Sequence, residues 1–181
     1  MKGIVFTEFL DLVESKFGLE MVDQIISSSD LKSGGSYTAI GTYEFSEMLQ
    51  LITNLSQNTS ISTDDLLLTY GEHFFSVLES GYPDMLASYS DAMALLSSIE
   101  NHIHVEVRKI YPDAELPTFE ILSQSENTLQ MIYRSSRAMH MFGLGLMRSA
   151  FKYFDQKSDI KYEKIEEDGT VVKFEIKLLT E

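Results

Sequence analysis

An alternating pattern of apolar and polar side chains begins in residues 118–137, TFEILSQSENTLQMIYRSSR. Thr118 to Leu122 and Thr128 to Tyr133 have the alternation and the β-branched and aromatic content of strands. The polar stretch Ser123 to Asn127 lies between them, so a hairpin is expected here. The chain before this stretch has helical periodicity, and its type of structure therefore changes at this point.

Downstream, a helix is followed by a second hairpin. Residues 138–154 resume a helical pattern rich in Met and Phe. Glu167-Asp168-Gly169 then lies between two alternating runs, Ile160 to Ile165 and Val171 to Leu178. An Asp-Gly pair between such runs is a strong hairpin signal.

Upstream, apolar residues recur at helical spacing in five segments. These are residues 3–17, 19–28, 43–53, 62–78 and 89–110. Ser62-Thr63-Asp64 is an N-terminal capping signal, and Pro112 and Pro117 end the helical part. The whole order predicts an α+β protein, in which a helical N-terminal part packs on an antiparallel sheet that has its own helix.

Composition limits the classes of function. The 181 residues suffice for one domain with one substantial core. Because 14 basic residues face 28 acidic ones, the net charge of -14 disfavours nucleic acids and anionic membranes as partners. The absence of cysteine excludes disulfides, thiolate metal sites and covalently attached heme. The opening residues do not form a signal peptide and no apolar run reaches 18 residues, so a cytoplasmic location is expected.

Two histidines are conspicuous candidates for chemistry. His102 and His104 flank the apolar stripe of segment 89–110 and lie about 200° apart around a helix. They cannot easily bind one ion together, and no nearby motif supplies the other ligands of a zinc site. The plainer interpretation is two histidines at the edge of the core, one facing a cavity and the other facing water.

A second candidate is the string Tyr133-Arg134-Ser135-Ser136-Arg137. In an extended segment alternate side chains project to one side, so Tyr133, Ser135 and Arg137 would form a clamp for a carboxylate. The alternative is a solvated strand end, where Arg137 pairs with one of many surface acids.

Evidence for catalysis is lacking in the sequence. Gly143-Leu144-Gly145 does not have the pattern of a dinucleotide site, and it indicates close helix packing instead. No nucleophile elbow, phosphate-binding loop or paired-carboxylate motif is visible. The chain is therefore not expected to be an enzyme.

The string around His104 resembles the heme-nitric oxide/oxygen-binding (H-NOX) family, which includes the heme domain of soluble guanylate cyclase. Ile103-His104, followed by Ile110-Tyr111-Pro112 and Leu116-Pro117-Thr118-Phe119, is similar to the proximal helix and following turn of that family. Tyr133-x-Ser135-x-Arg137 matches the family's Tyr-x-Ser-x-Arg motif.

The likeness extends from end to end, since Met1-Lys2-Gly3 and Gly71 to Tyr82 also resemble the family. It implies one H-NOX domain over residues 1–181. A helical part would cover about residues 1–60, and an α/β part enclosing the heme would cover about residues 61–181.

The resemblance implies heme b as cofactor, with His104 as the ligand to iron and His102 as a bystander. Tyr133, Ser135 and Arg137 would bind the heme propionates, and Pro117 matches a proline that presses on the heme and keeps it distorted. The further residues implied to line the heme pocket are Val5, Phe9, Phe74, Leu78, Phe142 and Leu146.

The choice of gas depends on the distal side. Oxygen-binding members carry a tyrosine at the position of Phe142, and without this donor bound oxygen lacks a hydrogen bond worth about 1.5–3 kcal/mol. The resemblance therefore implies a nitric oxide sensor that excludes oxygen and also binds carbon monoxide. His140 and Tyr70 are nearby polar residues that could supply a donor instead.

The resemblance also implies an output. Nitric oxide would weaken the bond between iron and His104, and the signal would pass to a sensor histidine kinase, a diguanylate cyclase or a phosphodiesterase. The alternative is a gas scavenger or heme-storage protein without a partner. A peroxidase is poorly supported, because the distal pocket has no acid–base residue.

Overall fold

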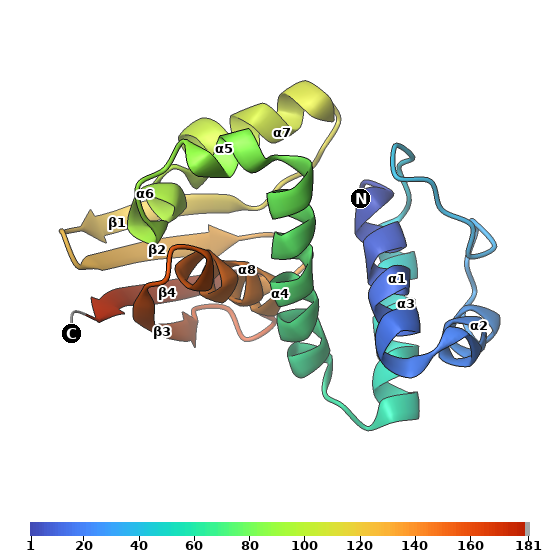
Figure 1. The fold of residues 1–181 in the computed structure, drawn as a ribbon. Coiled ribbons are helices and arrows are strands. Elements are labelled where there is room, and N and C mark those ends of the chain that lie inside the picture. Colours follow the sequence, from blue (N-terminus) through green and yellow to red (C-terminus); the bar gives the residue numbers. More distant parts are fainter. Residues whose placement is uncertain (180–181) are drawn as a thin grey trace. The chain divides into compact units, whose positions relative to one another are not determined.

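The computed structural model describes residues 1–179, which divide into two compact units at Tyr70/Gly71. The first unit is helical, and the second combines helices with a four-stranded sheet (Figure 1). The predicted α+β class is confirmed. The division lies at residue 70, instead of near residue 60 as the sequence indicated.

The first unit contains α1 (Ile4–Phe17), α2 (Leu19–Ser27), α3 (Phe45–Thr59) and the first part of α4 (Thr63–Gly81). The predicted capping residue is confirmed, since the Ser62 hydroxyl accepts the Asp65 amide at 3.1 Å at the start of α4. Each helix buries an apolar face, and this core comprises Phe6, Phe9, Leu12, Val13, Val22, Ile25, Met48, Leu51, Ile52, Leu55, Leu66 and Tyr70.

A buried carboxylate orders the long loop between α2 and α3. Glu47 is 3% exposed and accepts hydrogen bonds from the Ser33 hydroxyl at 2.5 Å, the Ser33 amide at 3.3 Å and the Tyr37 hydroxyl at 2.7 Å. Burial of a charge is tolerable when its oxygens are so bonded. The irregular segment is thus fixed to α3.

The sheet of the second unit is antiparallel, in the order β1-β2-β4-β3. Both predicted hairpins are confirmed: β1 (Thr118–Gln124) pairs with β2 (Thr128–Arg134), and β3 (Lys157–Lys164) pairs with β4 (Val171–Leu179). Gly169 has φ +78° in the second turn, a conformation that favours glycine. Pairing of β2 with β4 joins the hairpins into one sheet.

Helices cover one face of this sheet (Figure 1). The predicted helix over residues 138–154 is α8 (His140–Tyr153), which contacts β3 and α6 (Ala92–Ser97). Val172, Phe174 and Ile176 of β4 are buried, while the intervening Glu175 is exposed. This alternation is that of a sheet with one face packed and one face in water.

The expectation of a single helix over residues 89–110 is wrong. Asp91 caps α6, a π-helix η1 (Ile99–Ile103) follows, and α7 (His104–Ile110) completes the segment. The Ile103 amide bonds to the Ser98 carbonyl, five residues back, so the helical turn is widened there. A short helix that the sequence did not predict, α5 (Pro83–Ala87), precedes them.

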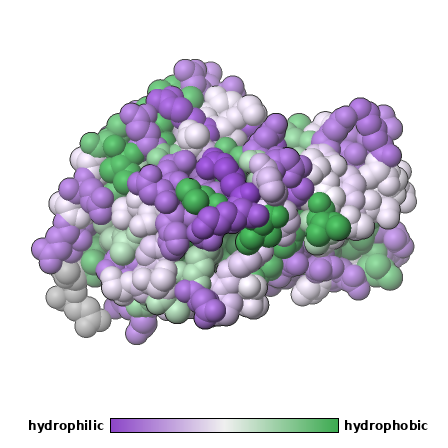
Figure 2. Space-filling view, turned by 90° about the horizontal axis from the view of Figure 1, so that it is seen from above, coloured by the Kyte–Doolittle hydropathy of each residue, from purple (hydrophilic) through white to green (hydrophobic). Residues whose placement is uncertain are grey.

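Exposed apolar side chains are interspersed with polar ones on the face seen in Figure 2. Among the described residues, the large apolar side chains that are exposed include Ile40, Leu19, Ile165, Leu122 and Ile110. Over residues 1–179, no helix combines the length and the apolar character needed to cross a membrane.

Candidate functional site

His104 lies at the start of α7, directly after the π-helix, and is 7% exposed. Its Nδ1 is 3.0 Å from Oε1 of Glu100, one turn earlier. The same carboxylate oxygen accepts the Phe119 amide of β1 at 2.8 Å. One oxygen of Glu100 therefore joins the histidine to the edge of the sheet.

The protonation of His104 follows from these contacts. Burial lowers its pKa below the ordinary value, and this effect outweighs the opposing influence of Glu100. The ring is then neutral at pH 7 and carries one N–H. Because a carboxylate only accepts, the proton is on Nδ1, and the lone pair of Nε2 is left for a metal.

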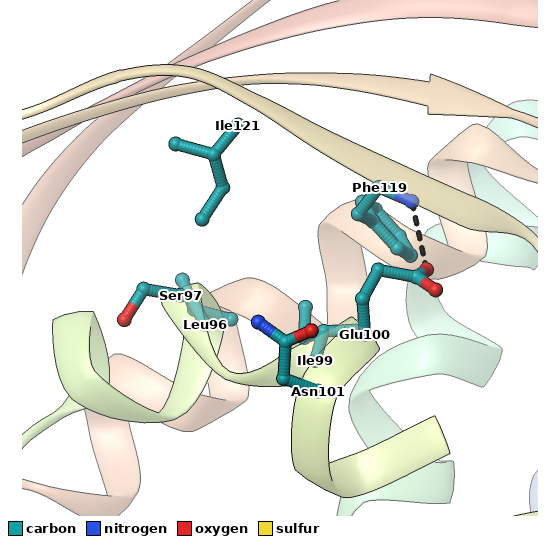
Figure 3. A pocket seen from close by; sticks show the side chains of 7 residues that line it. All are labelled: Leu96, Ser97, Ile99, Glu100, Asn101, Phe119 and Ile121. Carbon is teal, nitrogen blue, oxygen red and sulfur yellow. Dashed lines mark hydrogen bonds between the residues drawn. The ribbon is translucent and has the colours of Figure 1, made fainter. Parts of the chain in front are cut away.

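Aromatic rings continue inward from His104. The His104 ring lies 6.0 Å from Phe119 between centroids, and Phe119 lies 5.5 Å from Tyr133 on the neighbouring strand. Beside Glu100 there is a surface pocket of about 210 Å³ (Figure 3). Its lining residues are Leu96, Ser97, Ile99, Glu100, Asn101, Phe119 and Ile121.

The three residues of the predicted carboxylate clamp lie together at the end of β2, but for a different reason than alternation. The strand ends at Arg134, and residues 135–138 form a turn in which Ala138 has φ +51°. The Arg137 amide bonds to the Ser135 hydroxyl at 3.2 Å, and the Tyr133 hydroxyl accepts the Met139 amide at 3.0 Å. Turn geometry, not an extended strand, brings these side chains together.

Arg137 has a mostly buried side chain, 15% exposed, that already binds a carboxylate. Its Nη2 donates to Oε2 of Glu115 and its Nη1 to the Glu115 carbonyl, both at 2.6 Å. The Glu115 carboxylate stands in for any other carboxylate that this guanidinium could bind. Glu115 itself has a side chain that is 84% exposed, so a competing carboxylate can replace it readily.

The other histidines have different surroundings. His102 is hydrogen-bonded through Nδ1 to the Tyr89 hydroxyl, so it points to a different partner than His104. His140 is 3% exposed and lies against Tyr162, with ring centroids 5.5 Å apart. It is beside the turn at Gly169, where an added Cβ would lie 2.8 Å from Nδ1 of His140.

Four of the predicted pocket residues share one apolar face of the second unit. Phe74 and Leu78 are one turn apart on α4, as Phe142 and Leu146 are on α8. The Phe74 and Phe142 rings are 5.5 Å apart, and all four side chains are half-buried. An apolar surface of this kind suits a flat apolar ligand.

The predicted close packing of helices is confirmed at one of the two glycines. A Cβ added to Gly71 of α4 would lie 2.1 Å from the Phe142 carbonyl oxygen and 3.1 Å from Cα of Gly145. The space around Gly143, by contrast, contains no atom within 4 Å of such a Cβ among the described residues. Gly145, and not Gly143, is where α4 and α8 approach closely.

Comparison with known proteins places this arrangement in a family. The model of the haem-NO-binding family (HNOB) matches residues 2–162. The chain belongs to this family, the H-NOX domains. The predicted family is thereby confirmed, and a domain of this family is a heme-binding gas sensor and not itself a catalyst.

Solved H-NOX structures agree with the whole fold. The Fe(II) unliganded H-NOX protein from K. algicida is 66% identical, with a TM-score of 0.98, and the match covers 100% of this chain and 98% of that chain. The H-NOX protein from S. oneidensis in the Fe(II)NO ligation state is 25% identical, with a TM-score of 0.91 and coverage of 99% and 100%.

A curated relative is much longer. Soluble guanylate cyclase 89Db of Drosophila melanogaster is 26% identical over 157 residues, which are 85% of this chain but 23% of the cyclase. The chain thus spans less than a quarter of the length of the curated relatives it matches.

The H-NOX residues present fit a heme. The His104 ring is neutral and carries its proton on Nδ1, so the lone pair of Nε2 is available to bind iron as an axial ligand must. Arg137 donates to a carboxylate oxygen through Nη2 and to a backbone carbonyl through Nη1, so its guanidinium is oriented to bind an acidic group such as a propionate. Phe74 and Phe142 contribute the apolar surface.

Sequence reasoning missed two residues of this site. Glu100 lies four positions before His104, and a carboxylate at that spacing on a helix is a recognisable partner for a ligand histidine. Glu115 gives no such signal, because it reaches Arg137 from an irregular loop 22 residues away.

Arg137→Ala is expected to accelerate loss of heme. The charge-assisted hydrogen bond to a propionate would be removed, and at about 1.5–3 kcal/mol for a bond to a charged group this predicts roughly tenfold to a hundredfold faster loss. The measurement is transfer of heme to an excess of a heme-scavenging apoprotein, followed in the Soret band. Arg134→Ala is the matched control, since Arg134 makes an exposed 3.6 Å pair with Glu120. Equal rates in both variants would exclude the clamp.

Proposed function

We propose that this chain is a ferrous-heme nitric oxide sensor that excludes oxygen and works in the cytoplasm. The observation that carries the proposal is the state of His104: buried, neutral, and hydrogen-bonded through Nδ1 to Glu100. This leaves Nε2 as the one ring atom that can bind iron. Heme b, when bound, supplies an iron with one open position for a gas.

The other residues take the roles that the family resemblance implies. Arg137 neutralises propionate charge in a chain of net charge -14, and Tyr133 and Ser135 add hydroxyl groups beside it. Burial raises the pKa of Tyr133, so its hydroxyl keeps a proton to donate. Pro117, half-buried just before β1, is the residue proposed to press on the heme.

The gas pocket is proposed to be apolar. Phe74, Leu78, Phe142 and Leu146 supply one apolar face. Val5 and Phe9 of the first unit are assigned to the pocket by resemblance alone.

The two polar residues considered as alternative donors have different surroundings. The Tyr70 hydroxyl donates to the Val5 carbonyl at 2.6 Å, and Tyr70 is fully buried. His140 packs against Tyr162 and the Gly169 turn. The Tyr70 hydroxyl would have to give up its hydrogen bond to reach a bound gas, which supports exclusion of oxygen. Relatives of this chain have been solved in the Fe(II)NO and Fe(II)CO ligation states, which supports nitric oxide as the gas and carbon monoxide as a second ligand.

The proposed output is control of a separate signalling protein. His104, at the start of α7, would hold the iron, and a weakening of that bond by nitric oxide would be read by a sensor histidine kinase or by a diguanylate cyclase or phosphodiesterase. A gas can shift such an equilibrium only by its different affinity for the two states, and the His104 bond supplies that difference. This part of the proposal rests on the family resemblance.

His104→Gly is the direct test of the ligand. The variant is expected to purify without heme and to regain it when free imidazole is added, because imidazole replaces the missing ring. Soret absorbance with and without imidazole measures both steps. Heme retained at the wild-type level without imidazole would show that another residue binds the iron.

Phe142→Tyr tests the choice of gas. A phenol here is expected to stabilise bound oxygen by about 1.5–3 kcal/mol, which is a gain in affinity of roughly tenfold to a hundredfold. Oxygen titration of the ferrous protein measures it, and the same change at a buried residue of α4, Phe75→Tyr, is the control. A stable oxygen complex of the wild type in air would contradict the proposal.

Kinase regulation gives the last test of function. Autophosphorylation of a sensor histidine kinase that binds this chain is expected to fall when nitric oxide is added, and to be unaffected by oxygen. Phosphate incorporation with and without the gas is the measurement. A scavenger or storage protein would leave every such kinase unchanged, and this result would contradict a sensing role.

A further inference from the structure

The carboxylate of Glu100 links the proposed iron ligand to the sheet. Figure 3 shows this side chain rising from η1 with its oxygen toward the Phe119 amide. The same Oε1 lies 3.0 Å from Nδ1 of His104, and the Phe119 amide is 2.8 Å away. Two donors from different elements thus converge on a single charged oxygen.

The π-helix is what places this oxygen. In η1 the His104 amide bonds back to the Ile99 carbonyl, so the widened turn ends at the histidine itself. Glu100 is inside that turn and His104 is immediately after it. The side chain of Glu100 is 29% exposed, next to the 210 Å³ pocket, whereas that of His104 is 9% exposed.

The inference, which rests on the proposed function, concerns the strength of the bond that reports the gas. We propose that Glu100 is a positioning residue that fixes the His104 ring, strengthens its Nε2 as a donor to iron, and makes that strength sensitive to the position of β1. A carboxylate that accepts Nδ1–H gives the ring partial imidazolate character, and so raises its basicity at the opposite nitrogen. The Phe119 amide withdraws charge from the same oxygen, and a shift of β1 would alter this balance.

Two substitutions separate the effect of the negative charge of Glu100 from the effect of its side-chain length. Glu100→Gln keeps the length and an oxygen acceptor for both donors, but removes the negative charge. Glu100→Asp keeps the charge but draws the oxygens back by about one bond, roughly 1.5 Å. Glu106→Gln is the matched control: it removes the same charge from α7, where Glu106 pairs with Lys109 and not with His104.

The experiment is resonance Raman spectroscopy of the unliganded ferrous holoprotein, with heme transfer to a scavenging apoprotein as the second readout. In Glu100→Gln the iron–histidine stretching band is expected to move to lower frequency, the heme reduction potential to rise, and heme loss to accelerate by about tenfold or more. Glu100→Asp is expected to move the band in the same direction, so the test stands if only one of the two variants folds. Glu106→Gln should behave as wild type.

The outcomes separate this inference from the function beneath it. A wild-type band that stays unchanged in both Glu100 variants would overturn the role of Glu100 and leave a heme sensor in place. An equal shift in Glu106→Gln would also overturn it, because overall charge would then be the cause. Absence of any iron–histidine band in the wild type would refute both the inference and the proposed function.

Discussion

A hydrogen bond from a histidine ring to a carboxylate determines the chemistry available to this chain. His104 and Glu100 are only four residues apart, and their contact sets two properties at once: the nitrogen that carries the proton, and the direction of the remaining lone pair. Burial keeps the ring neutral against the influence of Glu100, but it fixes neither of these properties, since an isolated buried imidazole could carry its proton on either nitrogen. The carboxylate removes that choice, and the Phe119 amide holds the carboxylate.

Charge imposes a second constraint. With 28 acidic residues against 14 basic ones, a ligand with two carboxylates meets repulsion over most of the surface. Arg137 offsets this locally because its side chain is mostly buried, where the interaction is less screened than at an exposed arginine such as Arg134. Its bond to the exposed Glu115 shows that the guanidinium is oriented and accessible to a carboxylate. An acidic protein can thus bind an acidic ligand where a cationic side chain, here Arg137, is held in place.

Sequence patterns predicted the elements whose periodicity is regular and failed where local hydrogen bonds override it. Both hairpins could be located because alternation and the Asp168-Gly169 turn are local signals. The segment 89–110 has helical periodicity throughout. The Ile103 amide nevertheless bonds to the Ser98 carbonyl five residues back, and this backbone hydrogen bond cannot be read from the spacing of side chains. The motif at Tyr133 and Arg137 was found from its residue types and then matched by resemblance, while the turn that brings it together was not expected.

The exposure of Glu100 also bears on how such a site can be reversible. Breaking a fully buried ion pair by removing one partner is strongly destabilising, at about 3–5 kcal/mol, because a charge is left without solvent. Glu100 has a side chain that is 29% exposed beside an open pocket, so water can take the place of Nδ1 if His104 moves away. The bond to the Phe119 amide does not depend on the histidine and would keep the carboxylate in position. If His104 must leave Glu100 and return to it, this partly exposed carboxylate therefore suits the exchange better than a fully buried one.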